Sequence, residues 1–296
     1  MLKSRLCIAF FAFAVGCAPA QKPLTDYVNP MLGTATLWDS VDLGFKPTKR
    51  TWGAEVFPGS SLPNAMVQVS PVTKFHSGAG YQYEDSVIYG FTHTNKGHWN
   101  LCHIPLLPVT GTPTPGDYCS PFSHERESAA PGYYQVFLDR YGVDAQLSST
   151  LRCAFHKYTY PAGAAPAVLA DLQRSNEHVR AWDIRKEGDN VFAGWQQTGE
   201  KMYFYAVANR PVTGIEPVVE GDREVRIVRF GEGDGALELR IGFSFVSEKN
   251  ARENFEAEML GKSFAEVRSE ATATWNDLLG RIRVEGGTER EKGLFY

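Results

Sequence analysis

Apolar and polar residues alternate in short runs over residues 21–246 of this 296-residue chain. In the run 224–230, for example, Val225 and Ile227 are interleaved with Arg226. This period of two is typical of a strand with one face in a core. Further short runs rich in β-branched and aromatic residues lie at 65–70, 132–138, 151–160, 179–184, 202–208 and 236–246.

Clusters of Gly, Pro, Asn and Asp separate these runs, as at 161–166 and 231–235, and no helical pattern lies between them. Many short strands without intervening helices favour an antiparallel arrangement over a βαβ fold. We therefore predict a mostly β fold, a large antiparallel β-sandwich, over residues 21–246.

The pattern changes at Ser247. Residues 248–260 are charged and favour a helix, and a capping box formed by Ser263 and Glu266 predicts the start of a second one. Apolar residues of this second segment recur at spacings of three and four until Gly280, which gives one stripe for packing. Residues 247–280 are therefore predicted to be two linker helices.

Another capping box, Thr288 with Glu291, predicts a third helix close to the last residue, Tyr296. A helix of about two turns does not hold itself together in water without tertiary partners. One interpretation is a tail docked on the sandwich. The interpretation that we favour is that residues 281–296 begin a helical domain, which is cut off at the end of the chain.

The first residues have the pattern of an export signal. Lys3 and Arg5 precede an apolar run, 6–15, that is too short to span a bilayer. Residues 1–20 are therefore predicted to be a signal peptide, cleaved after Ala20 or, where residues 14–17 act as a lipobox, before a lipidated Cys17. Both routes export the protein, to the periplasm or to the outer membrane as a lipoprotein whose only membrane contact is its lipid anchor.

Composition narrows the function classes. The formal net charge of −4 argues against a nucleic-acid binder, which normally carries a basic face. Beyond the leader only Cys102, Cys119 and Cys153 remain, without Cys-x-x-Cys spacing, so no zinc site is predicted. One disulfide with a free thiol and three buried thiols are both open.

Side chains of the kind that bind ligands are concentrated in residues 90–108. Ordinary turns rarely gather imidazole, indole and ammonium groups, and binding groups tend to lie on loops held by a rigid scaffold. We therefore interpret this segment as a site loop. Its candidate residues include His93, His98, His103, Lys96, Trp99 and Asn100.

Two interpretations are open for the main candidates. His93 makes either a sugar contact or a structural hydrogen bond within the loop. Trp99 is either a stacking platform for a sugar ring or a packing residue at a domain interface. The three histidines of the segment do not share one side of a strand or helix and lack the tight spacing of zinc ligands, so no metal ligand is predicted among them.

Short motifs follow one another over nearly the whole chain after the leader: Tyr27-Val-Asn-Pro-Met-Leu-Gly-Thr34, Phe57-Pro-Gly59, Val67-Gln-Val-Ser-Pro71, Gly80-Tyr-Gln-Tyr83, Gly90-Phe-Thr-His-Thr94, Ser244-Phe-Val-Ser-Glu-Lys-Asn-Ala-Arg252, Trp275-Asn276 and Val284-Glu-Gly-Gly-Thr288. In this order they resemble the motifs of the bacterial α-mannosidases of glycoside hydrolase family 92. The resemblance implies a β-sandwich that is joined by linker helices to an (α/α)6 barrel.

The resemblance also implies an exo-acting, calcium-dependent, inverting enzyme that removes α-linked mannose from glycans. Such an enzyme uses two carboxyl groups on opposite faces of the sugar. The family's acid, base and most calcium ligands lie in the barrel, beyond Tyr296. No catalytic or metal-binding residue is therefore assigned to this chain, and we expect it to be inactive on its own.

In the family the active site lies between the two domains, and the loop after the Gly-Phe-x-His-Thr motif approaches it. The resemblance thus makes residues 90–108 one wall of a pocket for α-mannoside glycans, with Phe91, His93, Thr94 and Cys102 matching the pattern. Residues 96–101 replace a run of small residues found in many members, and an insertion follows Thr34, so the linkage preference is open. The substrate-binding residues predicted in this way are His93, Thr94, Lys96, His98, Trp99, Asn100, Trp38 and Trp52.

Alternatives from other classes have to be kept. In one alternative the chain is a free-standing carbohydrate-binding sandwich that uses Lys96, His98 and Trp99 without catalysis. In another it is a non-functional remnant of a reading frame that ends early. The residues encoded after Tyr296 would separate these alternatives from the front part of an exported α-mannosidase.

Overall fold

The structure is a computed structural model that describes residues 22–36, 44, 56–96 and 99–296. The predicted signal peptide with Cys17 lies outside the described residues, and so do three predicted substrate-binding residues: Trp38, Trp52 and His98. Among the described residues, no helix is both long and apolar enough to cross a membrane.

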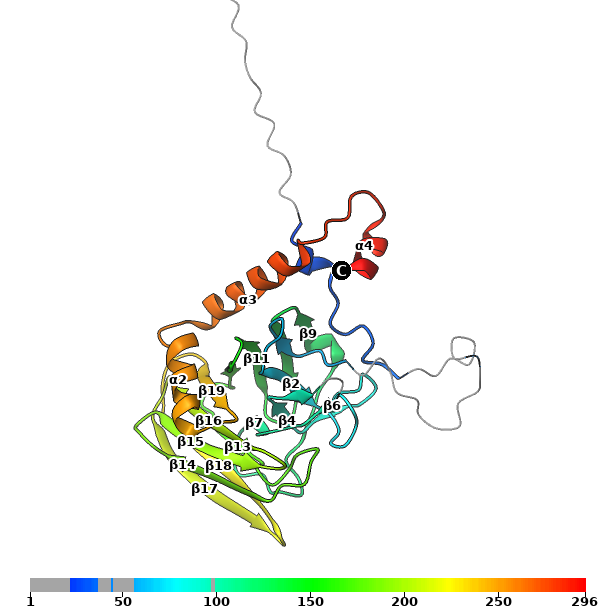
Figure 1. The fold of residues 1–296 in the computed structure, drawn as a ribbon. Coiled ribbons are helices and arrows are strands. Elements are labelled where there is room, and N and C mark those ends of the chain that lie inside the picture. The colour runs from blue at the N-terminus through cyan, green and yellow to red at the C-terminus, as the bar shows by residue number, and fades with distance from the viewer. Residues whose placement is uncertain (1–21, 37–43, 45–55, 97–98) are drawn as a thin grey trace, which may run out of the picture.

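Two antiparallel sheets form the body of the structure (Figure 1). The first has seven strands, in the order β1 (Ser60–Ser61), β2 (Gln68–Val72), β4 (Gly90–Thr92), β7 (Leu106–Val109), β13 (Ala167–Ala170), β18 (Arg223–Phe230) and β17 (Val212–Glu220). The second has eight, in the order β14 (Ala181–Lys186), β15 (Val191–Gln197), β16 (Lys201–Ala208), β19 (Leu237–Ser244), β12 (Cys153–Thr159), β11 (Val143–Ser149), β10 (Tyr133–Leu138) and β9 (Glu127–Ala130). Two further strand pairs are β3 (Val87–Ile88) with β8 (Ser120–Pro121), and β5 (Asn95–Lys96) with β6 (Trp99–Asn100).

One hydrophobic cluster draws side chains from both sheets and forms the core. Along β16, Met202 and Phe204 are buried in this cluster, whereas the intervening Tyr203 is half-buried on the opposite face of the sheet. The alternation seen in the sequence is thus the alternation between the core face and the outer face. The predicted antiparallel β-sandwich is confirmed.

The predicted helices are also present. They are α2 (Glu248–Glu258), α3 (Phe264–Leu279) and α4 (Glu289–Phe295), with two short 3-10 helices, η1 (Leu24–Tyr27) and η2 (His124–Arg126). Both predicted capping boxes form, with Ser263 and Thr288 as the N-caps of α3 and α4. Each hydroxyl accepts a hydrogen bond from the backbone N–H three residues later, which satisfies one of the donors at the helix start.

A second hydrophobic cluster joins the helices to the outer face of the eight-stranded sheet. Phe255 of α2 and Phe264 of α3 lie in it together with Phe155 of β12. Gly242 of β19 allows the close approach of α2, because a Cβ atom on it would lie 2.2 Å from the backbone oxygen of Ala251. The helices therefore cover part of this sheet instead of extending away from it.

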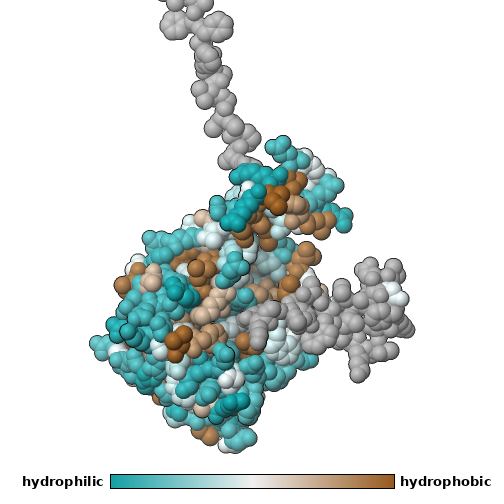
Figure 2. Space-filling view, in the orientation of Figure 1, coloured by the Kyte–Doolittle hydropathy of each residue, from teal (hydrophilic) through white to brown (hydrophobic). Residues whose placement is uncertain are grey.

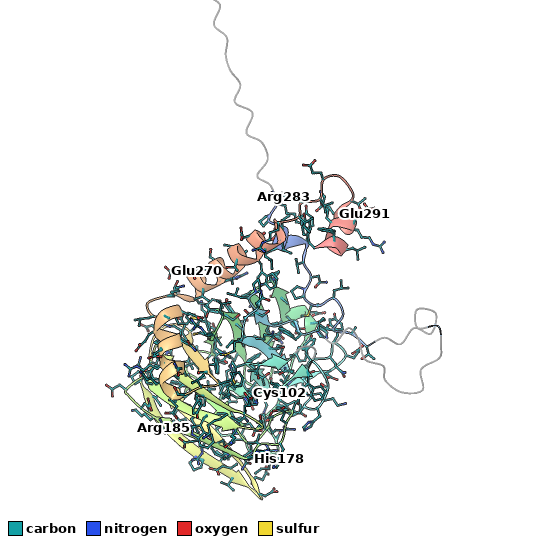
Figure 3. All side chains as sticks on the ribbon, in the orientation of Figure 1. Cys102, His178, Arg185, Glu270, Arg283 and Glu291 are labelled. Carbon is teal, nitrogen blue, oxygen red and sulfur yellow. The ribbon has the colours of Figure 1, made fainter. Side chains whose placement is uncertain are left out.

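The two ends of the described chain meet beside α3 (Figure 1). Residues of η1 contact α3 and α4, and the rings of Tyr27 and Tyr296 lie 5.8 Å apart. The indole Nε1 of Trp275 donates a hydrogen bond to the backbone oxygen of Ser61, at 2.8 Å, which ties α3 to β1. In Figure 3, Arg283 and Glu291 mark this end of the molecule.

A mainly apolar cavity of about 190 Å³ lies between this end and the sandwich. Val28, Phe57, Trp275 and Leu279 are among the residues that line it. Figure 2 shows apolar surface in the same region, below the terminal helices. Leu294 and Phe295 of α4 remain 70% and 51% exposed.

The three described cysteines Cys102, Cys119 and Cys153 are free thiols. Cys102 lies inside the sandwich (Figure 3) and Cys153 is also buried, and burial raises the pKa of both thiols above the usual range. The alternative of one disulfide is wrong for these residues. Cys119 is only half-buried, so two of the three thiols are buried and not all three, as the other alternative held.

Candidate functional site

The predicted site segment, residues 90–108, is built largely of strands. It runs from β4 through the β5–β6 hairpin to β7. Phe91 of β4 pairs with Leu106 of β7, and both are fully buried in the core. The segment therefore starts and ends inside the seven-stranded sheet, and only its middle part leaves that sheet.

The chain returns from β6 to β7 through a tight turn. Cys102 and Ile104 have positive φ angles, 53° and 54°, which are uncommon for residues with a side chain. Side-chain amides hold this backbone in place: the N–H of Cys102 donates to Oδ1 of Asn100 at 2.7 Å, and the N–H of Ile104 donates to Oε1 of Gln196 at 2.8 Å. The turn is thus fixed by buried hydrogen bonds to Asn100 of the same segment and to Gln196 of the eight-stranded sheet.

Two loops clamp the hairpin from outside. The N–H of Asn100 donates to the carbonyl of Gly78 at 2.9 Å, and Nδ2 of Asn176 donates to the carbonyl of Asn100 at 2.5 Å. Oδ1 of Asn176 in turn accepts from the N–H of His76 at 2.6 Å, so the two loops also hold each other. This frame leaves the hairpin little freedom at its base.

A chain of hydrogen bonds runs through two fully buried histidines. Nε2 of His93 lies 3.0 Å from Nε2 of His156, and Nδ1 of His156 lies 2.6 Å from the hydroxyl of Tyr158. Nδ1 of His93 faces the carbonyl of His103 at 3.4 Å. Because that carbonyl can only accept, His93 carries its proton on Nδ1, His156 donates from Nε2, and the Tyr158 hydroxyl donates to His156.

Every donor and acceptor in this hydrogen-bond chain has a partner when both imidazoles are neutral. Burial lowers the pKa of His93 to about 3 and lowers that of His156 well below its usual value. These two histidines therefore supply no cation and no free ring nitrogen to the surface.

A second chain of hydrogen bonds runs from Thr94 through His103 and reaches the surface at Glu177. The hydroxyl of Thr94 lies 2.9 Å from Nδ1 of His103, and Nε2 of His103 lies 3.0 Å from the hydroxyl of Thr198. Thr198 donates to Oε2 of Glu177 at 2.6 Å. The carboxylate can only accept, so the Thr198 hydroxyl donates to it and accepts from the Nε2–H of His103. Burial lowers the pKa of His103 to about 4, with Glu177 acting in the opposite direction.

The predicted substrate-binding residues fall into separate environments. His93, Thr94 and Asn100 are buried, and their side chains hold the frame. For His93 this favours the structural hydrogen bond, and the part of all three in substrate binding stays a prediction. Trp99 is half-buried on β6, and Lys96 lies on β5. Their part in substrate binding stays a prediction.

Sequence reasoning missed the residues that complete the frame: His156, Asn176, Glu177, Gln196 and Thr198. They lie 63 to 95 residues away from their partners in the segment, so no local pattern could show that they contact it. Glu177 alone presents an exposed group, because its side chain is 41% exposed.

A calcium site needs several carboxylate or other oxygen ligands close together. In residues 22–36, 44, 56–96 and 99–296, no three His, Cys, Asp or Glu side chains gather in a way that could hold a metal ion. The described residues therefore do not form a calcium site by themselves, and the resemblance assigns most of the ligands to the helical domain. Calcium dependence stays a prediction, and no chemical step is derived through it.

Residues 27–252 match the glycosyl hydrolase family 92 N-terminal domain, and residues 250–296 match the family 92 catalytic domain. A family 92 α-mannosidase from Bacteroides thetaiotaomicron is 25% identical to this chain, with a TM-score of 0.80 over 93% of this chain and 40% of that one. The same α-mannosidase in complex with mannoimidazole has a TM-score of 0.79, at 25% identity over 93% of this chain and 39% of that one.

Two more distant relatives agree in fold or class. A family 92 inverting mannosidase from Bacteroides thetaiotaomicron is 24% identical, with a TM-score of 0.78 over 93% of this chain and 39% of that one. An uncharacterized secreted glycosidase from Arthroderma benhamiae is 24% identical over 88% of this chain and 38% of that protein. The chain thus spans about two fifths of the length of these relatives.

Proposed function

Because the chain belongs to glycoside hydrolase family 92, we propose that it is the N-terminal part of an exported, inverting exo-α-mannosidase that acts on α-mannose-containing glycans. The observation that carries this proposal is the likeness to an α-mannosidase of the family over 93% of the chain, at a TM-score of 0.80. The complex of that α-mannosidase with mannoimidazole supports α-mannosides as the substrate class.

In this proposal the β5–β6 hairpin forms one wall of the sugar pocket. The support comes from its frame: the turn at Cys102, the Asn176 clamp and the two histidine hydrogen-bond chains fix its base. A wall that does not move keeps the sugar in one orientation, and this lowers the entropic cost of reaching the transition state. Trp99, half-buried at the start of β6, is the proposed aromatic contact.

The catalytic acid and base, together with the calcium ligands, belong in this proposal to the helical domain. The acid protonates the leaving oxygen while the base activates water on the other face of the ring. This chain contributes positioning and exclusion of water. We accordingly propose that residues 22–296 alone bind a glycan weakly and do not hydrolyse it.

Export is proposed from the leader pattern, with Cys17 as the site of a lipid anchor. The description of the Arthroderma relative as secreted supports the location outside the cytoplasm. Metabolic labelling with a palmitate analogue tests the anchor. Label in the native protein and none in a Cys17→Ala variant is the expected result, and equal labelling of both would contradict it.

The experiment for the main proposal uses the protein at the full length that its gene encodes. Incubation with an α-mannoside should release mannose, and proton NMR of the early time course should show the β-anomer first. Treatment with a calcium chelator should abolish the activity, and added calcium should restore it. No release of mannose would overturn the proposed activity, first appearance of the α-anomer would overturn inversion, and an unchanged rate after chelation would overturn calcium dependence.

A further inference from the structure

We propose that the outer face of strands β9 to β12, beside α3, is a second carbohydrate-binding site that holds an extended stretch of a glycan outside the catalytic pocket. The choice of ligand, an α-mannan, rests on the proposed function. The site itself rests on the shape and chemistry of this face, and it uses no residue of the 90–108 segment.

Two adjoining hollows form the groove. One, of about 600 Å³, lies between α3 and the sheet and is lined by Gln146, Lys157 and Arg268 among others. The other, of about 360 Å³, continues across the sheet to its β9 edge and is lined by Gln135 and Asp144 among others. The two linings are linked by a hydrogen bond that Nε2 of Gln146 donates to Oδ2 of Asp144, at 2.8 Å. We call the combined feature the β9–β12 groove.

The floor of the groove is a row of polar side chains, two amides and one ammonium group. Gln135 of β10 is the cross-strand partner of Gln146 of β11, which in turn is the partner of Lys157 of β12. Neighbouring strands lie about 4.8 Å apart, so these side chains repeat at a distance close to the width of one pyranose ring. Successive sugars of an extended chain can therefore meet successive side chains.

Internal hydrogen bonds fix this row before any ligand arrives. Oε1 of Gln135 accepts from the hydroxyl of Tyr133 at 2.8 Å, and Nε2 of Gln135 donates to Oδ1 of Asp144 at 2.7 Å. Asp144 is thereby held between the two amides of Gln135 and Gln146. Side chains that are already ordered lose little rotamer freedom when they bind, which favours weak ligands such as single sugar units.

Two arginines that make cation–π contacts with aromatic rings lie beside the row. The guanidinium of Arg268 lies 3.6 Å from the ring centre of Tyr133, and that of Arg126 lies 4.0 Å from the ring centre of Phe137. Within the described part of the chain, neither Arg268 nor Lys157 forms an ion pair, so their N–H groups can donate to hydroxyls. Arg126 is paired with Asp139 and adds no net charge.

The charges and hydrogen-bonding groups of the β9–β12 groove favour a neutral polyol as the ligand. The cations Lys157 and Arg268 are balanced by the carboxylates of Asp144 and Glu125, which leaves no net charge to hold a polyanion. Amide, carboxylate and guanidinium groups each offer two atoms in one plane, which suits pairs of adjacent hydroxyls on a sugar. Phe264 and Ala265 of α3 add apolar lining, on which the C–H face of a sugar ring can pack. A glycan chain therefore fits the groove better than a protein partner.

Affinity electrophoresis of the 296-residue chain in gels containing yeast α-mannan, with dextran gels as the control polysaccharide, tests this site. The chain should be retarded by α-mannan, and a Gln135→Ala/Gln146→Ala variant should bind at least tenfold more weakly. A Gln197→Ala variant is the matched control, because Gln197 is also half-buried on this sheet but lies on β15, away from the groove. Thermal melts confirm that all variants are folded.

The outcomes separate this site from the proposed activity. Retardation that is lost in the double variant and kept in Gln197→Ala supports the groove. Retention of binding by the folded double variant, or its loss only in Trp99→Ala, overturns the groove. Absence of retardation in the native chain also overturns it, while release of mannose by the full-length protein shows that the activity proposed above still stands.

Discussion

Asn276 and Thr25, which are 251 residues apart in the sequence, hold each other through two hydrogen bonds. The backbone N–H of Thr25 donates to Oδ1 of Asn276 at 3.0 Å, and Nδ2 of Asn276 donates to Oγ1 of Thr25 at 3.2 Å. This pair joins η1 to α3 and brings the motif that begins at Tyr27 beside the Trp275-Asn276 motif. Two segments that are far apart in the sequence are thus held together next to their motifs.

Replacing Asn276 by Ala should destabilise this contact. The N–H of Thr25 would lose its partner, and leaving such a group unsatisfied costs about 1–3 kcal/mol. Hydrogen exchange is the suitable measurement, with faster exchange at Thr25 and in α4 than in the native chain. Asp277→Ala, an exposed change on the same helix, is the control. Equal exchange in Asn276→Ala and the native chain would show that the pair does not hold the two ends together.

Acid should destabilise the sandwich through its buried histidines. His93, His103 and His156 are neutral in the fold, whereas an unfolded chain protonates them near a pKa of about 6.5. The unfolded state therefore binds more protons as the pH falls, so this stability is complete above about pH 6.5. It is lost as the pH drops toward the folded pKa values of about 4 for His103 and about 3 for His93.

Each of these histidines contributes a slope of up to about 1.4 kcal/mol per pH unit. Urea unfolding at about pH 7 and about pH 5 measures the loss, and the window above pH 5 largely avoids the carboxylates. A His103→Gln variant should show a smaller difference between the two pH values than the native chain, and the exposed His178→Gln should not. An unfolding free energy that is the same at both pH values would contradict the neutral, buried assignment.

Gly242→Ala should weaken the seating of α2 on the sheet. The new methyl group would lie 2.2 Å from the backbone oxygen of Ala251 and 2.8 Å from the backbone nitrogen of Phe255, neither of which can rotate away. Overpacking of this kind costs about 1–3 kcal/mol. The free energy of unfolding in urea measures the loss. Gly199→Ala, with open space around its Cβ position, is the control, and equal effects at both positions would refute the packing argument.

Trp99→Ala in the full-length protein should impair substrate use more than folding. We expect kcat/KM for an α-mannoside to fall at least tenfold, about 1.4 kcal/mol, while the unfolding free energy changes by less than that. Trp99→Phe keeps a flat ring and should recover part of the activity. If stability and kcat/KM fall together, Trp99 is a packing residue, as the second interpretation of the sequence holds.

The parts of the fold that could be predicted are those with local causes. Ser263 and Glu266 are three residues apart, and their mutual hydrogen bonds fix the start of α3 within one turn. The alternation along β16 and β18 reflects the two faces of a strand and needs no knowledge of its neighbours. β17 escaped prediction because it contains Gly214 and Pro217, and its edge position explains why Pro217 is tolerated there.

The candidate site could be located from the sequence but not interpreted. The density of imidazoles in residues 90–108 was a true signal of an unusual segment. Whether His93 points to solvent or to His156 depends on how β4 and β12 face each other across the core, which no local pattern contains. The alternation rule offered one hint, since His156 stands between Phe155 and Lys157 at a position where β12 turns inward.

The order of strands in the eight-stranded sheet has a consequence for biogenesis. β19 pairs on one side with β16 and on the other with β12, so it is the seam between two halves of the sheet, β14 to β16 and β9 to β12. Until residues 237–244 have emerged, each half ends in an open edge that can pair with another chain. In the proposed export, a chain that is threaded through a membrane from its N-terminus completes this sheet only after β19 has crossed. Until then the exposed edges of β16 and β12 are sites for pairing with another chain.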